Sequence, residues 1–550
     1  MKEYLREKIL QVLEELGYEG YTPAFEKPKD EKFGDISTNI AMLIAKDKKL
    51  NPRETANKII ENLKLSDDYV SKIVTAGPGF INFYTSENYY RKIPADILAK
   101  GLCYGKSDLH KGEQANIEWV SANPTGPLHA GHGRHISLGK AVASLLEWSG
   151  YKVTREYYFN NAGKQMENLA ASVYARYRQL FEPDYKLPDD AYIGEYIISI
   201  AQLLKDEYGD ELLKKKNGSD IFKSTGEKWC FDSILNTLKR MGITHDILFN
   251  EDSLYKDGKI KKILDDFKKN NLSYEKDGAV WLKTSGLIKD RKDAEDKVIV
   301  KASGEPTYRL PDMAYHIDKL CRGYDLVLDI FGSDHSDTYK EVLAGVKALG
   351  YDTSKITVII HQMVTFMHEG KPVKMSKRSD NVYYLDDLLD GVGADVAQFF
   401  FVMRSANTHL DFDVDLAKEQ SEKNPVFYLQ YAHARICGIL RNADSMVPGF
   451  RSAVVNDFSG LKEPEEIKLC KALSIFPEIV EDAALTFEPH KIITYLNEMA
   501  EHFHKFYHNH RVLNIGDDKL TMQRLRLCEA SKIVLQNGLN IIGVSTPERM

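Results

Sequence analysis

The segment Ser121-Ala-Asn-Pro-Thr-Gly-Pro-Leu-His-Ala-Gly-His-Gly-Arg-His135 is the part of this chain on which the fold prediction rests. The residues before it, 114–121, have the apolar, β-rich composition of a buried strand. Those after it, 136–148, place Leu138, Val142 and Leu145 on one face and predict a helix. A strand, a Gly/Pro turn and a helix start form an anion site, because free backbone N–H groups and the helix dipole point at the turn. We therefore expect a nucleotide phosphate to bind here.

The common phosphate-binding loops do not match this segment. A Walker A loop needs four residues between its glycines, whereas five separate Gly133 from Gly139. The dinucleotide fingerprint fits Gly131 and Gly133 but would need a glycine at Ile136. Both readings fail, so another class of nucleotide site is needed.

Two short motifs supply that class. His129-Ala-Gly-His132 is poor as a zinc site, because no Glu lies between its histidines and no Cys is nearby. Lys374-Met-Ser-Lys377 follows 245 residues later, behind the β-like run 356–361. Together they resemble the HIGH and KMSK signatures of class I aminoacyl-tRNA synthetases, with Ala where Ile usually stands. Alone, each motif also fits a packed histidine pair or a solvated basic run; in this order they favour the class.

Length, composition and charge limit the classes of protein to which the chain can belong. At 550 residues the chain needs about three or four domains. It is 43% hydrophobic and 28% charged, no apolar run is long enough to span a membrane, and the N-terminus resembles a helix start rather than a signal peptide. The six cysteines form no C-x-x-C pair, which predicts reduced thiols in a cytoplasmic protein. The net charge of −7 argues against indiscriminate DNA binding, although a local basic surface can still meet tRNA.

Residues 1–110 are expected to form a separate α+β domain. Phe33-Gly-Asp-Ile-Ser-Thr-Asn39 and Ala76-Gly-Pro-Gly-Phe-Ile-Asn-Phe83 resemble the N-terminal extension of arginyl-tRNA synthetases. The resemblance implies that this domain grips the elbow of the tRNA. By composition alone, a packing or solubility domain would fit as well.

The catalytic domain is expected over 111–395. Arg155-Glu-Tyr-Tyr-Phe-Asn-Asn-Ala-Gly-Lys-Gln165 resembles an arginyl-family segment, with Asn161 in place of Asp. The helical, charged part at about 170–290 predicts an insertion between the halves of a Rossmann-like fold. The family has a substrate-facing acid in such a segment, which Glu251 would match; a plain surface acid is the alternative.

The substrate prediction rests on Tyr308 and Asp312, four residues apart and on one face if a helix begins here. A carboxylate can hold the planar guanidinium of arginine by two hydrogen bonds, and aromatic walls can desolvate and align it. The spacing matches the tyrosine and aspartate that arginyl-tRNA synthetases use on the arginine side chain. Outside that family, a first-turn Asp and a packed Tyr would be the ordinary explanation.

The same resemblance implies the remaining pocket residues. Glu118, Ser121, Asn123 and His129 fall at the spacings of the family's amino-acid pocket, and a Ser and an Asn at a strand end can hold the arginine backbone. Gly332-Ser-Asp334-His335 resembles the family's Gly-x-Asp-His loop, placed after a strand where doubly wound folds bind ligands.

For ATP, the expected ligands are His129, Gly131, His132, Gly332, Asp334, His335, Lys374, Met375, Ser376 and Lys377. Of these, His129, His132, Lys374 and Lys377 are the predicted catalytic residues, because donors and cations can stabilise the phosphate charge that develops in adenylate formation. ATP should arrive with Mg²⁺, and no tightly bound cofactor or structural metal is expected. Many arginyl enzymes lack a clear KMSK and need tRNA for activation; the motif here puts a strict requirement in doubt.

From about residue 396 the pattern becomes helical and aromatic residues alternate with basic ones, which suits unstacked RNA bases. The segment resembles the anticodon-binding helical domain (396–550) of bacterial-type arginyl-tRNA synthetases, although core packing is the commoner role of any single aromatic. The predicted tRNA-binding residues are Tyr428, Gln430, Tyr431, Arg435, Tyr507 and Arg511.

The resemblance covers essentially the whole chain and implies a multidomain α/β protein that activates L-arginine with ATP and transfers it to tRNA(Arg), as a monomer. Two alternatives stay open. A class I synthetase for another amino acid is one, although a cysteinyl enzyme would need zinc-binding residues that the scattered cysteines do not provide. A tRNA-binding paralogue without activity is the other.

Overall fold

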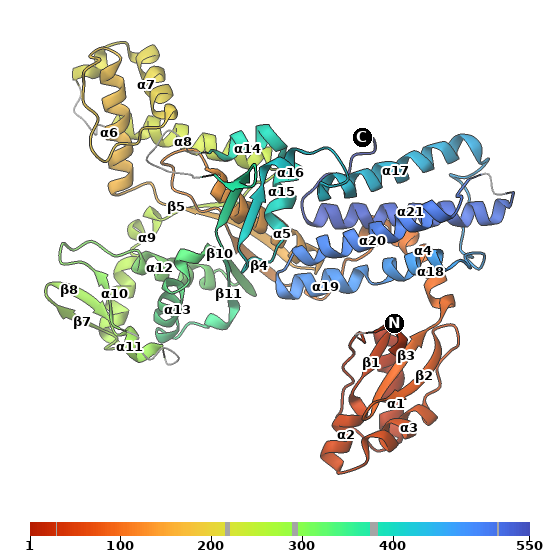
Figure 1. Ribbon diagram of the computed structural model, residues 1–550. Helices are drawn as coiled ribbons and strands as arrows, with labels where there is room; N and C mark the ends of the chain where they lie inside the picture. Colours follow the sequence, from red (N-terminus) through yellow and green to blue (C-terminus); the bar gives the residue numbers. More distant parts are fainter. Residues whose placement is uncertain (29, 215–219, 289–294, 374–382, 514–515) are drawn as a thin grey trace.

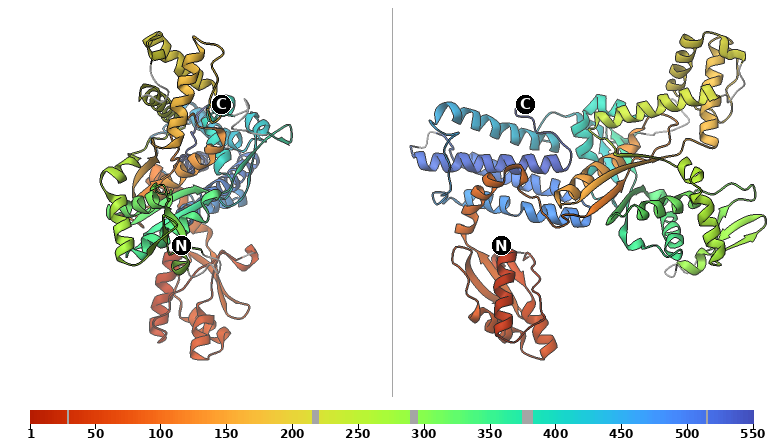
Figure 2. Two further views of the ribbon diagram at one scale, coloured as in Figure 1. Left: turned by 90° about the vertical axis from the view of Figure 1, so that its left-hand side faces the viewer. Right: turned by 180° about the vertical axis from the view of Figure 1, so that it is seen from behind.

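The computed structural model describes residues 1–28, 30–214, 220–288, 295–373, 383–513 and 516–550. A parallel sheet lies near the middle of the molecule, between a helical arm and an α/β lobe on one side and a bundle of long helices on the other (Figure 1). The N-terminal domain extends away from the bundle. The turned views in Figure 2 show the same elongated arrangement.

The central sheet has five parallel strands in the order β11-β10-β4-β5-β6. Their bounds are Ile356–His361, Leu326–Gly332, Gln114–Glu118, Lys152–Phe159 and Ile247–Asn250, respectively. The strand order reverses between β4 and β10, and ligands of doubly wound folds bind in the crevice at such a point. The predicted Rossmann-like core is confirmed.

Helix α5 (Gly133–Trp148) begins directly after the His129–His132 motif and packs closely on the sheet. A Cβ atom on Gly139 would lie 2.2 Å from the Trp119 ring, so glycine allows this close approach. The helix is buried on most of its surface, because α15 (Ala394–Val402) and α19 (Phe476–Thr486) also pack against it.

Between β5 and β6 the chain forms the helical arm of Figure 1, built from α6 (Lys164–Gln179), α7 (Glu195–Tyr208) and α8 (Asp220–Arg240). The predicted helical insertion at 170–290 therefore also contains a strand of the main sheet, β6. It further holds α9 (Asp252–Lys256), α10 (Lys259–Lys269), β7 (Ser273–Lys276), β8 (Ala279–Leu282) and α11 (Thr284–Leu287). Helical periodicity misses these strands, because four-residue strands among charged residues carry little pattern.

Strands β7 and β8 pair with β9 (Lys297–Val300) in a small antiparallel sheet. Helices α12 (Arg309–Cys321) and α13 (Thr338–Ala348) then flank β10 in sequence. After β11, strands β12 (Val364–His368), β13 (Lys371–Pro372) and β14 (Leu410–Asp413) form a further sheet. The part expected to be helical from 396 thus contributes one strand, β14, and α14 (Leu385–Val392) and α16 (Val414–Lys418) lie in the same region.

The C-terminal bundle consists of α17 (Pro425–Met446), α18 (Pro464–Ser474), α19, α20 (His490–Asn509) and α21 (Asp518–Ile541). Helix α4 (Glu87–Lys100) packs on α18 and α21 and connects the bundle to the N-terminal domain. The C-terminal tail returns to the catalytic domain, where Lys140 Nζ donates to the Gly543 carbonyl at 2.9 Å. The helical C-terminal domain is confirmed.

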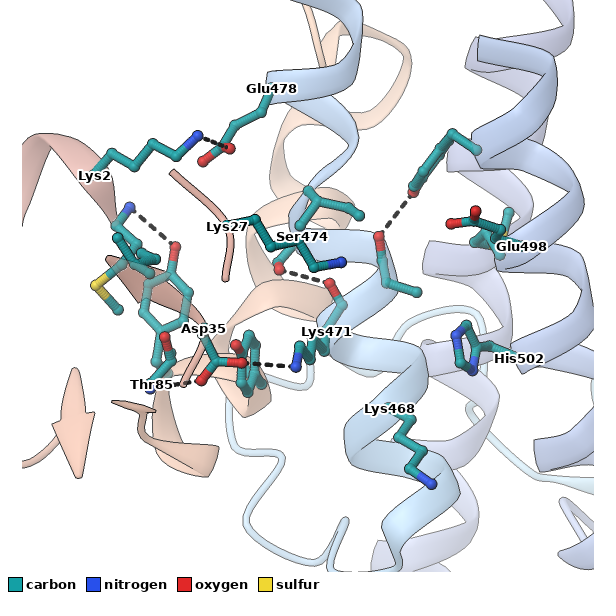
Figure 3. A pocket seen from close by; sticks show the side chains of 18 of the residues that line it. Lys2, Lys27, Asp35, Thr85, Lys468, Lys471, Ser474, Glu478, Glu498 and His502 are labelled. Carbon is teal, nitrogen blue, oxygen red and sulfur yellow. Dashed lines mark hydrogen bonds and ion pairs between the residues drawn. The ribbon is translucent and has the colours of Figure 1, made fainter. Parts of the chain in front are cut away.

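The N-terminal domain has α1 (Lys2–Glu15), α2 (Ile40–Lys48) and α3 (Pro52–Asn62) around a sheet of β1 (Ile36–Thr38), β3 (Phe80–Thr85) and β2 (Val70–Ala76). It has a separate hydrophobic core, in which Leu5, Ile40, Ile59 and Phe83 are fully buried. A cavity of about 320 Å³ lies between this domain and the bundle. Figure 3 shows Lys471 against Asp35 and Lys2 against Glu478 around it.

None of the helices in the described part of the chain combines the length and apolar character needed to cross a membrane. All six cysteines are free thiols.

Candidate active site

The carboxyl end of β4 carries the first predicted site residues on strained backbone. Val120 and Ser121 have φ values of 72° and 43°, and a β-branched residue rarely adopts such a conformation. The strain directs the chain so that the Ser121 hydroxyl donates to Glu118 Oε1 at 2.8 Å and accepts from the Tyr158 N–H at 3.2 Å. Asn123 Oδ1 accepts from the Asn160 N–H at 2.9 Å, which ties this loop to the end of β5.

The two histidines of the predicted phosphate site lie at the start of α5. Their rings stack with centroids 3.6 Å apart, and both are half-buried. Gly131 lies in the short turn between them, and a Cβ there would come within 3.1 Å of His129 Nδ1. The turn thus places two imidazoles beside the positive end of a buried helix, where anions are stabilised.

Across the crevice, β10 ends at Gly332 and runs into the turn Ser333–His335. Asp334 and His335 are exposed, and the His335 ring lies 5.4 Å from the ring of Phe331. This loop and the His129–His132 turn therefore border the same edge of the sheet, at the ends of the adjacent strands β10 and β4. The predicted ATP ligands Lys374, Met375, Ser376 and Lys377 lie outside the described residues.

On the sheet side of α12, the Asp312 carboxyl is partly buried and makes no hydrogen bond or ion pair with any described residue. Burial raises its pKa to about 7, the nearby charges of Glu118 and Glu251 act in the same direction, and His316 and Lys319 oppose them. Three acids thus converge, and of these Asp312 has no direct partner, which favours the binding of a cation beside it.

Tyr308, just before α12, is 58% exposed, with the Arg309 guanidinium 4.8 Å from its ring centre. Glu251 precedes α9 and accepts a hydrogen bond of 2.5 Å from the Tyr158 hydroxyl. Its placement among the acids around Asp312 favours the substrate-facing role over that of a plain surface acid.

The sequence analysis expected aromatic walls around the guanidinium but did not identify Tyr158, Tyr315 or Phe249 as the residues that form them. The Tyr315 ring lies 4.6 Å from Tyr158 and 4.7 Å from Phe249, measured between centroids. Behind them, Glu156 accepts hydrogen bonds from Tyr315, Asn116 and Arg322. The aromatic strand 155–159 was a usable signal for Tyr158, whereas no spacing in the sequence pointed to Glu156 or Arg322.

A second group of predicted residues lies on the bundle. Arg435 donates to the Tyr431 hydroxyl at 3.0 Å, its guanidinium lies 5.9 Å from the Tyr507 ring centre, and the Tyr428 ring packs on His504. Gln430 differs, because it is buried and its amide donates to Asp395 and to the Ser545 carbonyl. Since those bonds occupy its donors, we assign Gln430 to holding the C-terminal tail. Arg511 is exposed in the segment after α20.

Among the described residues, no three His, Cys, Asp or Glu side chains are arranged to hold a metal ion. The predicted site residues instead gather at the carboxyl edge of the sheet, with imidazoles and a helix start on one side and carboxylates with aromatic rings on the other. Groups of these kinds suit a nucleoside triphosphate next to a cationic small molecule.

Comparison with known proteins agrees with this geometry. Three family models match the chain: the arginyl-tRNA synthetase N-terminal domain over residues 3–85, the class I (R) tRNA synthetase catalytic domain over 93–407, and the DALR anticodon-binding domain over 429–550. The arginine–tRNA ligase of Desulfotalea psychrophila is 47% identical over 96% of this chain and 94% of its own length. That of Salinibacter ruber is 43% identical over the full length of both.

Solved structures show the same fold. The arginyl-tRNA synthetase of Thermus thermophilus matches with a TM-score of 0.78 and 20% identity over the full length of both chains. That of Plasmodium falciparum matches with a TM-score of 0.72 and 18% identity over 100% of this chain and 99% of its own. On the family models and the identities with the curated ligases, the chain belongs to the arginyl-tRNA synthetase family.

Proposed function

We propose that the crevice between β4 and β10 is where this chain performs the arginine–tRNA ligase reaction of its family, with the residue roles given below. In the first step the arginine carboxylate attacks the α-phosphorus of ATP, pyrophosphate leaves, and arginyl-adenylate forms. In the second step the 2′-hydroxyl of the terminal adenosine of tRNA(Arg) attacks the arginyl carbonyl and AMP leaves.

The observation that carries the residue assignment is the partly buried carboxyl of Asp312, which makes no direct ion pair or hydrogen bond with any described residue. A guanidinium bound there would be held by Asp312 and Glu251 beside the contacting rings of Tyr158 and Tyr315, with Tyr308 at the mouth. A site built around an unmet carboxylate rejects a neutral side chain by roughly 10⁴-fold, because the carboxylate would otherwise stay buried and unpaired.

The other end of arginine then lies toward Glu118, Ser121 and Asn123. Glu118 suits the α-ammonium group, because its carboxylate is oriented by Ser121. His129 and His132 face the triphosphate from the start of α5, and Gly131 gives it access to the backbone. Gly332, Asp334 and His335 are proposed for the adenosine, and Lys374, Met375, Ser376 and Lys377 for the leaving pyrophosphate.

ATP enters as its magnesium complex, so the ion belongs to the substrate and the protein needs no ligand set of its own. For tRNA, we assign the exposed face of α17 and α20 around Tyr428, Tyr431, Arg435 and Tyr507 to the anticodon loop, with Arg511 beside it. The N-terminal domain is assigned to the tRNA elbow. Six free thiols suit a reducing cytoplasm, and we propose a monomer.

The first test is aminoacylation of bulk tRNA with each of the twenty amino acids, comparing the unaltered enzyme with Asp312→Ala and Asp312→Asn. We expect charging by arginine, with its kcat/KM reduced by about 10³-fold or more in both variants. Asp265→Ala, which removes an exposed aspartate of α10, is the matched control and should behave as the unaltered enzyme.

Unchanged arginine kinetics in the Asp312 variants would remove the pocket assignment while leaving the enzyme class in place. Charging by a different amino acid would contradict arginine as the substrate. Binding of tRNA without any charging would support the alternative that the chain is a tRNA-binding paralogue without activity.

A further inference from the structure

A buried ionic network lies directly beneath the proposed arginine site. Lys319 of α12 has no exposed surface, and its Nζ donates to Glu118 Oε2 at 2.8 Å and to Asp329 Oδ1 at 2.5 Å. The other oxygen of Asp329 lies 3.0 Å from His316 Nε2. The network therefore joins α12 to two adjacent strands, β4 and β10.

A fully buried ammonium group is costly unless carboxylates compensate it. Burial lowers the pKa of Lys319, but the carboxylates of Asp329 and Glu118 outweigh this effect and raise it. Burial raises the pKa of Glu118, and the Lys319 cation opposes that rise. Lys319 therefore favours the charged form of Glu118 in a place where burial favours the neutral one.

Lys319 also fixes the direction of the Glu118 carboxylate. One of its oxygens accepts from Lys319 and the other from the Ser121 hydroxyl, so the group is held from two sides. A carboxylate has about four acceptor positions, so both oxygens keep capacity for a further donor. Glu118 is thus preset for a cationic ligand group.

The same helix face carries the acid proposed for the guanidinium. Asp312, Tyr315, His316 and Lys319 follow one another at helical spacing, and His316 Nδ1 lies 2.7 Å from the Asp312 carbonyl. Because Lys319 anchors this face to Glu118 and Asp329, it sets where α12 lies relative to β4. The two acids proposed for the two ends of arginine are thereby held in one geometry.

We propose that Lys319 is a positioning residue for arginine: it orients the Glu118 carboxyl group, and it anchors the α12 face that carries Asp312. This inference rests on the proposed function of the pocket. Lys319 has no exposed surface and acts through Glu118 and the α12 face, so its removal should weaken arginine binding and leave ATP binding unchanged.

The test measures the KM of arginine and of ATP, together with kcat, by aminoacylation with saturating tRNA. Lys319→Met keeps the length and removes the charge, and we expect the arginine KM to rise about 10- to 100-fold with the ATP KM within about twofold. Lys319→Gln retains a donor without the charge and serves if the Met variant does not fold; it should change the same constant in the same direction. Lys259→Met is the control. It breaks a partly exposed ion pair between α10 and Asp318 of α12, and it should change neither the arginine KM nor the ATP KM.

Asp329→Asn separates positioning from packing. It leaves Glu118 as the carboxylate partner of Lys319, and the Asn oxygen can still accept from Lys319, so the anchor of α12 and arginine binding should persist even where thermal stability falls. A uniform loss of kcat with both KM values unchanged in folded Lys319 variants would overturn the proposal, as would an Asp329→Asn variant whose arginine KM rises as much as that of Lys319→Met. Glu118→Gln tests the pocket assignment on which this proposal rests. If the variant leaves the arginine KM unchanged, Glu118 does not bind arginine, and the proposed function of the pocket is contradicted independently of Lys319.

Discussion

Burial raises the pKa of Asp312 and so determines how much of the empty enzyme carries a charged carboxylate for the arginine side chain to bind. The raised pKa of about 7 means that near neutral pH a substantial fraction of the empty enzyme carries the neutral carboxyl. The arginine side chain stays cationic over the whole accessible range, so it pairs with the carboxylate form and binding releases a proton. Arginine affinity is therefore linked to pH through this one group.

We expect arginine to bind more tightly as pH rises, with the dissociation constant falling by up to about tenfold per pH unit below the Asp312 pKa and levelling off above it. The sign follows from the raised pKa, because the proton must leave before the ion pair forms. Calorimetric titration with arginine between pH 5.5 and 8.5 measures this, and buffers of different ionisation enthalpy report the released proton. Asp312→Asn is the control, since it should bind weakly at every pH; a flat profile in the unaltered enzyme would contradict the linkage.

At the scale of elements, the packing of α5 on β4 positions the proposed phosphate site. Gly139 lies in the middle of that helix, where replacement by alanine would ordinarily stabilise by about 1 kcal/mol. Here the added Cβ would come within 2.2 Å of the Trp119 ring, far closer than a van der Waals contact. Overpacking should therefore make the Gly-to-Ala substitution destabilising at this position, whereas in most helices it is stabilising.

We expect Gly139→Ala to destabilise the catalytic domain by about 1–3 kcal/mol, because Trp119 is buried and has no room to move. Urea unfolding followed by Trp fluorescence measures the change. Gly286→Ala in α11, where a Cβ meets nothing within 4 Å, is the matched control and should be neutral or slightly stabilising. Equal stability of the Gly139 variant and the unaltered chain would contradict the close-packing explanation.

Elements were predictable where a local pattern determined them. The β-like run 356–361 coincides with β11, and α12 begins at Arg309, which meets the condition under which Tyr308 and Asp312 were expected to share a face. The pocket walls were not predictable in this way, because Glu118 and Lys319 meet across 201 residues and Tyr158 meets Glu251 across 93. Such contacts depend on the strand order of the sheet, which the periodicity of a single segment does not contain.

At the scale of the molecule, the N-terminal domain meets the bundle around a cavity that is lined by ion pairs as well as by apolar side chains (Figure 3). Lys471 of α18 lies 2.7 Å from Asp35, and Lys2 lies 2.5 Å from Glu478 of α19. Small polar interfaces within a chain permit relative motion of domains. The proposed anticodon and elbow contacts lie on the two sides of this joint, so its stiffness should affect tRNA and leave the small substrates unaffected.

We expect Lys471→Glu to loosen the N-terminal domain, because it places two carboxylates side by side at a partly buried position where the native pair contributes about 1 kcal/mol. The radius of gyration from small-angle scattering should increase and the KM for tRNA should rise, while the KM values of arginine and ATP stay unchanged, since the altered side chain is remote from the crevice.

The matched control is Lys468→Glu, which should have the smaller effect. Lys468 is on the same helix and lines the same cavity, but it has no ion-pair partner in the described structure. High salt should mimic the Lys471 change by screening the same pair. A Lys471 variant that keeps both its dimensions and its tRNA kinetics would show that this ion pair does not hold the joint, and that covalent continuity through α4 and its packing on α18 and α21 suffice.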